Sequence, residues 1–146
     1  MTTVCWDGVS LAADSQATTS SGVRCRATKI VKSPNGFVAA GAGGLNSITP
    51  WLRWVAAGLK PADQPTTLDK ESTILIVDPR GRAYTFEGSA VRLAMRDKQW
   101  AIGSGSDLAL GAMAMGADAR TAVKVAAKFD VYTGGRIVVL TPGKAT

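Results

Sequence analysis

The chain has 146 residues, of which 46% are hydrophobic and 19% are charged, and its formal net charge is +6. This length and composition are typical of one globular domain over residues 1–146 and argue against a disordered chain. The basic residues are scattered and do not form a stripe interleaved with aromatic side chains. A solvated basic face is therefore favoured over a nucleic-acid-binding surface.

The start of the chain, Met-Thr-Thr-Val, has no basic segment followed by an apolar one, so it does not predict a secretory signal. The apolar stretches are too short to span a bilayer. We therefore expect a cytoplasmic protein without a membrane partner. Cys5 and Cys25 lack metal-type spacing, and without histidine no zinc site is plausible. They could form one disulfide, but two reduced, buried thiols are the simpler expectation.

The first half of the chain predicts two hairpins and a helix. Alternating, β-rich segments separated by turn signals predict strands at residues 2–6, 9–13, 28–32 and 37–42. A Ser/Thr/Gly-rich connection joins the two hairpins. Apolar residues at helical spacing predict a helix over 45–59, and a Pro-rich linker follows at 60–67.

The second half predicts more strands and two further helices. Strands are expected at residues 73–77, 82–86, 91–95, 100–102 and 137–140. Helices are expected at 107–115 and 118–129, and Asp118 is the predicted N-cap of the second one. Segregated strands and helices in this order indicate an α+β fold whose sheets are built from hairpins, with helices outside them.

Elimination narrows the possible chemistry. The absence of histidine excludes Ser-His-Asp and Cys-His catalysis, and neither a Walker loop nor GxGxxG occurs. Paired carboxylates for glycosidic chemistry remain open, but most of the 11 acidic residues adjoin turns or helix starts. A nucleophile that carries its own base also remains. An N-terminal threonine is such a group, because its α-amine has an ordinary pKa of about 8. Thr2 becomes N-terminal if Met1 is removed.

Four motifs follow one another along nearly the whole chain: residues 2–4 with 8–18, 29–31 with 36–44, 101–106, and 130–135. In this order they resemble the proteasome β-subunit and HslV family of N-terminal-threonine peptidases. The resemblance implies an Ntn-hydrolase αββα sandwich of two antiparallel sheets. Only one helix and a linker fit between Gly44 and Thr73, so the outer helical layer is expected to be reduced.

The resemblance implies a threonine-type peptidase that hydrolyses peptide bonds and works in a homo-oligomeric ring on peptides or unfolded proteins. An AAA+ ATPase unfoldase is a possible partner, since the chain has no ATP-binding motif. The alternatives are a catalytically silent structural or assembly protein with the same fold, and a basic binding module.

The resemblance also implies roles for single residues. Thr2 is the nucleophile, Asp14 pairs with Lys29, and Lys29 favours the neutral amine and the developing alkoxide. Gly41 matches the glycine whose N–H binds the oxyanion. Ser104 matches a serine near the threonine amine.

Asp130 and Thr133 match residues that support that amine. No cofactor is required, but Na⁺ or K⁺ could bind the carbonyls of Ala127, Asp130 and Thr133. The substrate-binding residues that the resemblance implies are Ala17, Thr18, Ala27, Val31 and Ala39. Because most of these are small and apolar, hydrophobic side chains before the scissile bond are expected.

Overall fold

The first antiparallel sheet contains the start of the chain at its centre. In this computed structural model, which describes residues 2–144, its strand order is β10-β1-β2-β11. The strands are β10 (Trp100–Gly103), β1 (Thr3–Trp6), β2 (Leu11–Ala13) and β11 (Val138–Leu140). Pairing of Val4 with Ala13 and with Ile102 confirms the first predicted hairpin and joins it to a distant strand.

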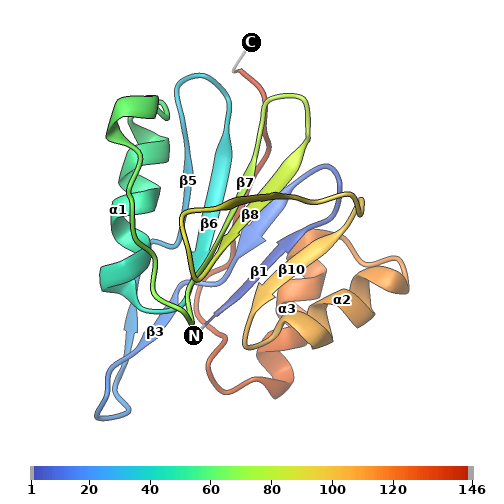
Figure 1. Cartoon of the computed structure of the whole chain (residues 1–146). Helices are drawn as coiled ribbons and strands as arrows, with labels where there is room; N and C mark the ends of the chain where they lie inside the picture. Colours follow the sequence, from blue (N-terminus) through green and yellow to red (C-terminus); the bar gives the residue numbers. More distant parts are fainter. Residues whose placement is uncertain (1, 145–146) are drawn as a thin grey trace.

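A second antiparallel sheet packs against the first (Figure 1). Its order is β5-β6-β7-β8-β9. The strands are β5 (Ile30–Lys32), β6 (Val38–Ala42), β7 (Thr73–Val77), β8 (Ala83–Glu87) and β9 (Arg92–Ala94). All strand pairs in it are antiparallel neighbours along the chain, and the pairing of β5 with β6 confirms the second predicted hairpin.

Helices cover the outer faces of the two sheets (Figure 1). Helix α1 (Leu45–Ala56) packs on the second sheet, while α2 (Ser106–Ala114) and α3 (Ala119–Phe129) pack on the first. The helix predicted over 45–59 ends earlier, because Gly58 and Leu59 both take positive φ angles. The linker holds one 3₁₀ turn, Pro61–Asp63.

Small and apolar residues fill three cores: one between the two sheets, one beneath α2 and α3, and one beneath α1. The alternation of side chains along each strand explains how one strand contributes to two of them. On β1, Val4 and Trp6 face the core between the sheets, whereas Cys5 faces α2 and α3. On β6, Ala40 faces the inter-sheet core and Ala39 faces α1. Successive strand residues point to opposite faces, so a strand covered on both sides reads as continuously apolar. The described residues thus form an α+β fold with three antiparallel sheets and three α-helices.

The third sheet is a two-stranded ribbon that the sequence does not predict. It pairs β3 (Gln16–Thr18) with β4 (Arg24–Arg26) and projects beyond the body of the protein (Figure 1). Cys25 lies on β4 and is exposed, so the expectation of a buried thiol is wrong there; Cys5 is buried and free as expected.

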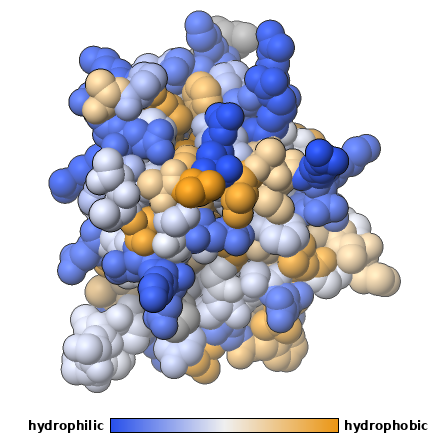
Figure 2. Space-filling model, in the orientation of Figure 1, coloured by the Kyte–Doolittle hydropathy of each residue, from blue (hydrophilic) through white to orange (hydrophobic). Residues whose placement is uncertain are grey.

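The surface is mostly hydrophilic on the face drawn in Figure 2, with apolar side chains over α2. The exposed large hydrophobic residues include Leu108 on α2 and Met115 just after it, and Met115 is 89% exposed. Within residues 2–144, none of the helices has the length and apolar character that a bilayer span needs.

Candidate active site around Thr2

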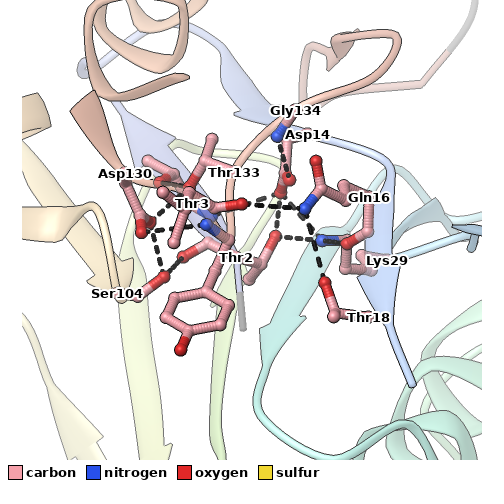
Figure 3. Close-up of polar contacts among 12 residues, drawn as sticks. Thr2, Thr3, Asp14, Gln16, Thr18, Lys29, Ser104, Asp130, Thr133 and Gly134 are labelled. Carbon is pink, nitrogen blue, oxygen red and sulfur yellow. Dashed lines mark hydrogen bonds and ion pairs between the residues drawn. The ribbon is translucent and has the colours of Figure 1, made fainter. Parts of the chain in front are cut away.

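Thr2, Asp14 and Lys29 meet where three strands begin or end. Thr2 immediately precedes β1, Asp14 follows β2, and Lys29 precedes β5. The three side chains point toward one another (Figure 3). Thr2 and Asp14 are each 1% exposed and Lys29 is 4% exposed. The strand pairing within the two sheets therefore brings these three residues into one buried polar cluster, although Thr2 and Lys29 are 27 positions apart in the sequence.

Lys29 uses its ammonium group fully in this cluster. It donates to the Thr2 hydroxyl, to Asp14 Oδ1 at 2.9 Å and to the Gln16 carbonyl oxygen at 2.5 Å. An ammonium group has three donors, so no further hydrogen bond is available to it. Burial lowers the pKa of Lys29, and the nearby Asp14 carboxylate opposes that shift. The ammonium is therefore both aimed at Thr2 and easier to deprotonate than an exposed lysine.

Asp14 accepts hydrogen bonds from several directions. The Thr2 hydroxyl donates to Oδ1, and the Thr3 N–H donates to the same oxygen at 3.2 Å. The Gly134 N–H donates to Oδ2 at 3.0 Å. Such a set satisfies a buried carboxylate that would otherwise be costly to desolvate. Asp14 is thus fixed, and it orients Lys29.

A second polar group lies on the other side of Thr2. Asp130 Oδ2 accepts hydrogen bonds from Ser104 Oγ and from Thr133 Oγ1, each at 2.6 Å, and its Oδ1 accepts one from the Tyr132 N–H at 3.1 Å. Burial by itself raises the pKa of Asp130, but these hydrogen bonds outweigh it and the pKa is lowered. An ionised Asp130 is therefore favoured.

This group contacts the first residues of the chain. Ser104 Oγ lies 3.4 Å from the carbonyl oxygen of Thr2. The hydroxyls of Thr133 and Thr3 share a hydrogen bond of 2.7 Å. The structure thus brings together Thr2, Asp14 and Lys29 on one side and Ser104, Asp130 and Thr133 on the other.

The structure differs from the prediction at Gly41. Its N–H donates to the Lys29 carbonyl oxygen at 3.0 Å, so it is engaged between β5 and β6. A side chain at this position would collide with Ile48 and Ile74, which explains the glycine by the packing of α1. Gly41 therefore does not direct a free N–H toward the Thr2 hydroxyl.

A cleft of about 660 Å³ opens beside Lys29 and is called the main cleft below. Its lining includes Ala17, Thr18, Lys29, Gly43, Asp69 and Glu71. Gly43 has φ +125°, and a β-carbon there would lie about 2.4 Å from Ser72 Oγ. Only glycine fits this backbone and this close approach.

The predicted substrate residues divide into three places. Ala17 and Thr18 line the main cleft. Val31 and Ala39 pack instead in the core beneath α1, because the alternation of β5 and β6 turns them to that face. Ala27 lines a separate cavity of about 330 Å³ together with Asp14 and Arg136.

The predicted cation ligands lie at the end of α3. Ala127 belongs to its last turn, Asp130 is its C-cap, and the Asp130 carbonyl accepts the Thr133 N–H at 3.1 Å. Among the residues described, no cluster of three or more His, Cys, Asp or Glu side chains could hold a metal ion. A carbonyl-bound Na⁺ or K⁺ stays a prediction.

Sequence reasoning missed Gln16, Thr3 and Gly134. The Gln16 side chain donates to the Val131 carbonyl oxygen at 3.0 Å and to Thr18 Oγ1 at 3.3 Å, so it ties the β3 ribbon to the loop after α3. Gly134 packs directly against Gln16 and contacts Asp14 through its N–H. The Gly134-Gly135 pair was the available signal, since such close approaches require glycine.

No family model matches the sequence, and no curated protein matches it significantly. Many solved structures resemble the fold, among them two of one protein. One is Thiobacillus denitrificans BPH, with a TM-score of 0.72, 21% sequence identity, and 98% of each chain covered. The other is the same protein in complex with epoxomicin, a proteasome inhibitor, with a TM-score of 0.72, 20% identity and 100% of each chain covered. The chain therefore shares its whole α+β fold with BPH.

Proposed function

We propose that this chain is an N-terminal-threonine peptidase with an Ntn-hydrolase αββα sandwich, formed as one domain over residues 1–146. Thr2 is the nucleophile once Met1 has been removed. The observation that carries the proposal is the contact of the Thr2 hydroxyl with both the Lys29 ammonium and the Asp14 carboxylate in a buried site. The epoxomicin complex of BPH, a protein of the same fold, supports it.

The α-amine of Thr2 acts as the general base. While Met1 is attached, that nitrogen is a peptide N–H and has no basic lone pair. After processing, a neutral amine takes the hydroxyl proton as Oγ1 attacks the carbonyl carbon of the scissile peptide bond. The positive charge of Lys29 favours the neutral amine and stabilises the developing alkoxide. The buried surroundings strengthen both effects.

The acyl-enzyme then forms and is hydrolysed. The tetrahedral intermediate collapses, the C–N bond breaks, and the protonated amine of Thr2 gives its proton to the leaving amine. An ester on Thr2 Oγ1 remains. Water attacks this ester with the same amine as base, and the carboxylate product leaves while the hydroxyl is restored.

The start of α1 is the better source of an oxyanion donor than Gly41. Gly43, Gly44 and Leu45 line the main cleft, and α1 has no side-chain cap at its N-terminus. The first N–H groups of a helix have no intrahelical partner, and they carry partial positive charge. We assign oxyanion stabilisation to this segment.

Asp130, Ser104 and Thr133 position the N-terminal residue. Ser104 contacts the Thr2 carbonyl, and Thr133 contacts the neighbouring Thr3 hydroxyl. These contacts hold the backbone of Thr2 so that its amine and hydroxyl face the same carbonyl carbon. This group supplies orientation, which is worth a large part of a catalytic barrier.

The proposal extends to assembly. Leu108, Met115, Phe129 and Val131 are exposed apolar side chains on or near α2 and α3. Such exposure is typical of contact surfaces, and it supports a homo-oligomer, for which we propose a ring. Peptides or unfolded proteins are the proposed substrates, in the cytoplasm, and an AAA+ unfoldase is a possible partner.

A catalytically silent assembly protein with the same fold is the second candidate. It is favoured by one observation, the engagement of the Gly41 N–H within the sheet. It predicts that Met1 is retained and that no peptide is cleaved.

Hydrolysis of fluorogenic peptides by the wild type, Thr2→Ala and Thr2→Ser separates the two candidates. We expect the wild type to turn over, Thr2→Ser to retain part of the activity, and Thr2→Ala to lose it while its unfolding midpoint stays unchanged. Thr3→Ser is the matched control, because its hydroxyl is kept and it is not the nucleophile. Equal rates for the wild type and Thr2→Ala would overturn the proposal.

A further inference from the structure

We propose that the main cleft selects a positively charged substrate side chain, lysine or arginine, and that Asp69 and Glu71 determine this preference. The inference rests on the proposed peptidase function, because the cleft is lined by Lys29, whose ammonium group donates to the Thr2 hydroxyl. It replaces the expectation of a hydrophobic side chain, which depended on a set of small, apolar lining residues that included Val31 and Ala39. Both of those residues are in the core beneath α1.

The acidic wall is held in place by α1. The Asp69 N–H donates to Ser47 Oγ at 2.9 Å, and the Ser72 N–H donates to the Asp69 carbonyl oxygen at 2.9 Å. These bonds anchor the segment before β7 against the first turn of the helix. Asp69 and Glu71 thereby line a cleft whose other walls come from β3 and from the glycines before α1.

The charges of the cleft do not cancel. The Lys29 ammonium is already paired with Asp14. In residues 2–144 the only other ion pair joins Arg82 to Asp78, so neither Asp69 nor Glu71 has a cationic partner there. The N-terminus of α1 offsets roughly half a charge. A net negative wall remains in a chain whose total charge is +6.

The rest of the lining suits the stem of a long basic side chain. Ala17 and Leu45 give an apolar surface, along which the methylene groups of lysine or arginine can pack while the charged head reaches a carboxylate. A hydrophobic side chain would leave the carboxylates of Asp69 and Glu71 without a cationic partner in the cleft.

The test measures both cleavage and binding. For cleavage, kcat/KM is compared for peptides that differ only in arginine, leucine or glutamate before the scissile bond. We expect arginine to exceed leucine by about tenfold, which corresponds to a modest charge pair, and glutamate to be poorest. The preference for arginine over leucine should shrink as the salt concentration is raised.

The Asp69→Asn/Glu71→Gln double variant should bring the ratio of kcat/KM for the arginine and leucine peptides close to one. Asp63→Asn, which changes an exposed acid outside the cleft, should leave that ratio unchanged.

Binding separates this inference from the proposed function. Fluorescence anisotropy of the same labelled peptides with Thr2→Ala needs no catalysis. Tighter binding of the arginine peptide, lost in Thr2→Ala that also carries Asp69→Asn and Glu71→Gln, supports the inference even if the wild type cleaves nothing. Cleavage without any charge preference would overturn the inference and leave the peptidase proposal standing. Equal or absent binding of all three peptides would also overturn it.

Discussion

Lys29 Nζ lies 2.9 Å from Asp14 Oδ1, and at least 96% of each residue is removed from solvent, since they are 4% and 1% exposed. Removing one partner of a buried ion pair leaves the other charge uncompensated, which costs about 3–5 kcal/mol. We therefore expect Lys29→Met to lower the free energy of unfolding by about that amount and to abolish turnover. Urea unfolding monitored by tryptophan fluorescence measures the change in the free energy of unfolding.

The control for this prediction is Lys124→Met, on the exposed face of α3, which should change stability by about 0.5 kcal/mol or less. Lys29→Met combined with Asp14→Asn should be more stable than Lys29→Met alone, because no buried charge remains unpaired. A loss below about 1 kcal/mol for Lys29→Met would contradict a structural role for the pair.

Asp130 predicts an acid-sensitive contribution to stability. Its pKa is lowered in the fold, so the ionised form adds stability above the unfolded pKa of about 3.9, and this is lost as pH falls through the folded pKa. Asp130→Asn should therefore unfold at a lower temperature than the wild type at pH 7. The corresponding loss in the free energy of unfolding should be about 1 kcal/mol or less, because the group is partly exposed.

Thermal unfolding at pH 7 and at pH 3 tests the sign. The gap between Asp130→Asn and the wild type should be narrower at pH 3 than at pH 7, because pH 3 lies below the unfolded pKa of about 3.9, where the stability contributed by the ionised carboxylate is being lost. Asp63→Asn serves as the control and should show no such change. A gap that is the same at both pH values would argue against the hydrogen-bonded carboxylate.

Gly43 is expected to tolerate no side chain. Its φ of +125° and the approach of Ser72 leave no room for a β-carbon. Gly43→Ala should lower the unfolding free energy by more than the roughly 1–2 kcal/mol that a positive φ alone costs, and should reduce kcat/KM by displacing the wall of the main cleft. Gly22→Ala is a matched control, since Gly22 also has a positive φ but faces open space. Equal losses in both variants would refute the steric argument.

The two cysteines should differ sharply in reactivity. Burial raises the pKa of the Cys5 thiol to about 12, whereas Cys25 is exposed on the β3–β4 ribbon. Because the thiolate is the reactive form, a colourimetric thiol reagent should titrate one thiol in the native protein and two in denaturant. Cys25→Ser should leave none in the native state. Rapid reaction of both thiols before denaturation would contradict the packing of β1 beneath α2 and α3.

Much of the fold follows from local patterns. The predicted hairpin between residues 2–6 and 9–13 and the N-cap of α3 are confirmed, and Asp118 accepts a hydrogen bond from the Thr121 N–H at 2.8 Å. Both features depend on residues close together in sequence, where turn and capping chemistry act. The β3–β4 ribbon was missed because all three residues of β4 are exposed and show no apolar alternation.

The candidate site was predictable only in part, because sequence motifs do not encode the direction of backbone groups. Motif order indicated that Thr2, Asp14 and Lys29 would meet, but it carries no information on which way an N–H points. The engaged N–H of Gly41 depends on the pairing of Ile30 with Ala40, which only the three-dimensional register reveals. Asp69 and Glu71 lie in the segment just before β7, which carries no motif, and they reach the cleft because that segment docks on α1.

The central claim is that Thr2 becomes a reactive N-terminal threonine, and intact mass spectrometry after treatment with an epoxyketone peptide tests it most directly. The reagent adds to both the hydroxyl and the free α-amine, so one addition reports processing and nucleophilicity together. We predict a species that lacks Met1 and carries one inhibitor mass, absent in Thr2→Ala. A protein that retains Met1 and gains no mass would contradict the peptidase account and favour the silent assembly protein of the same fold.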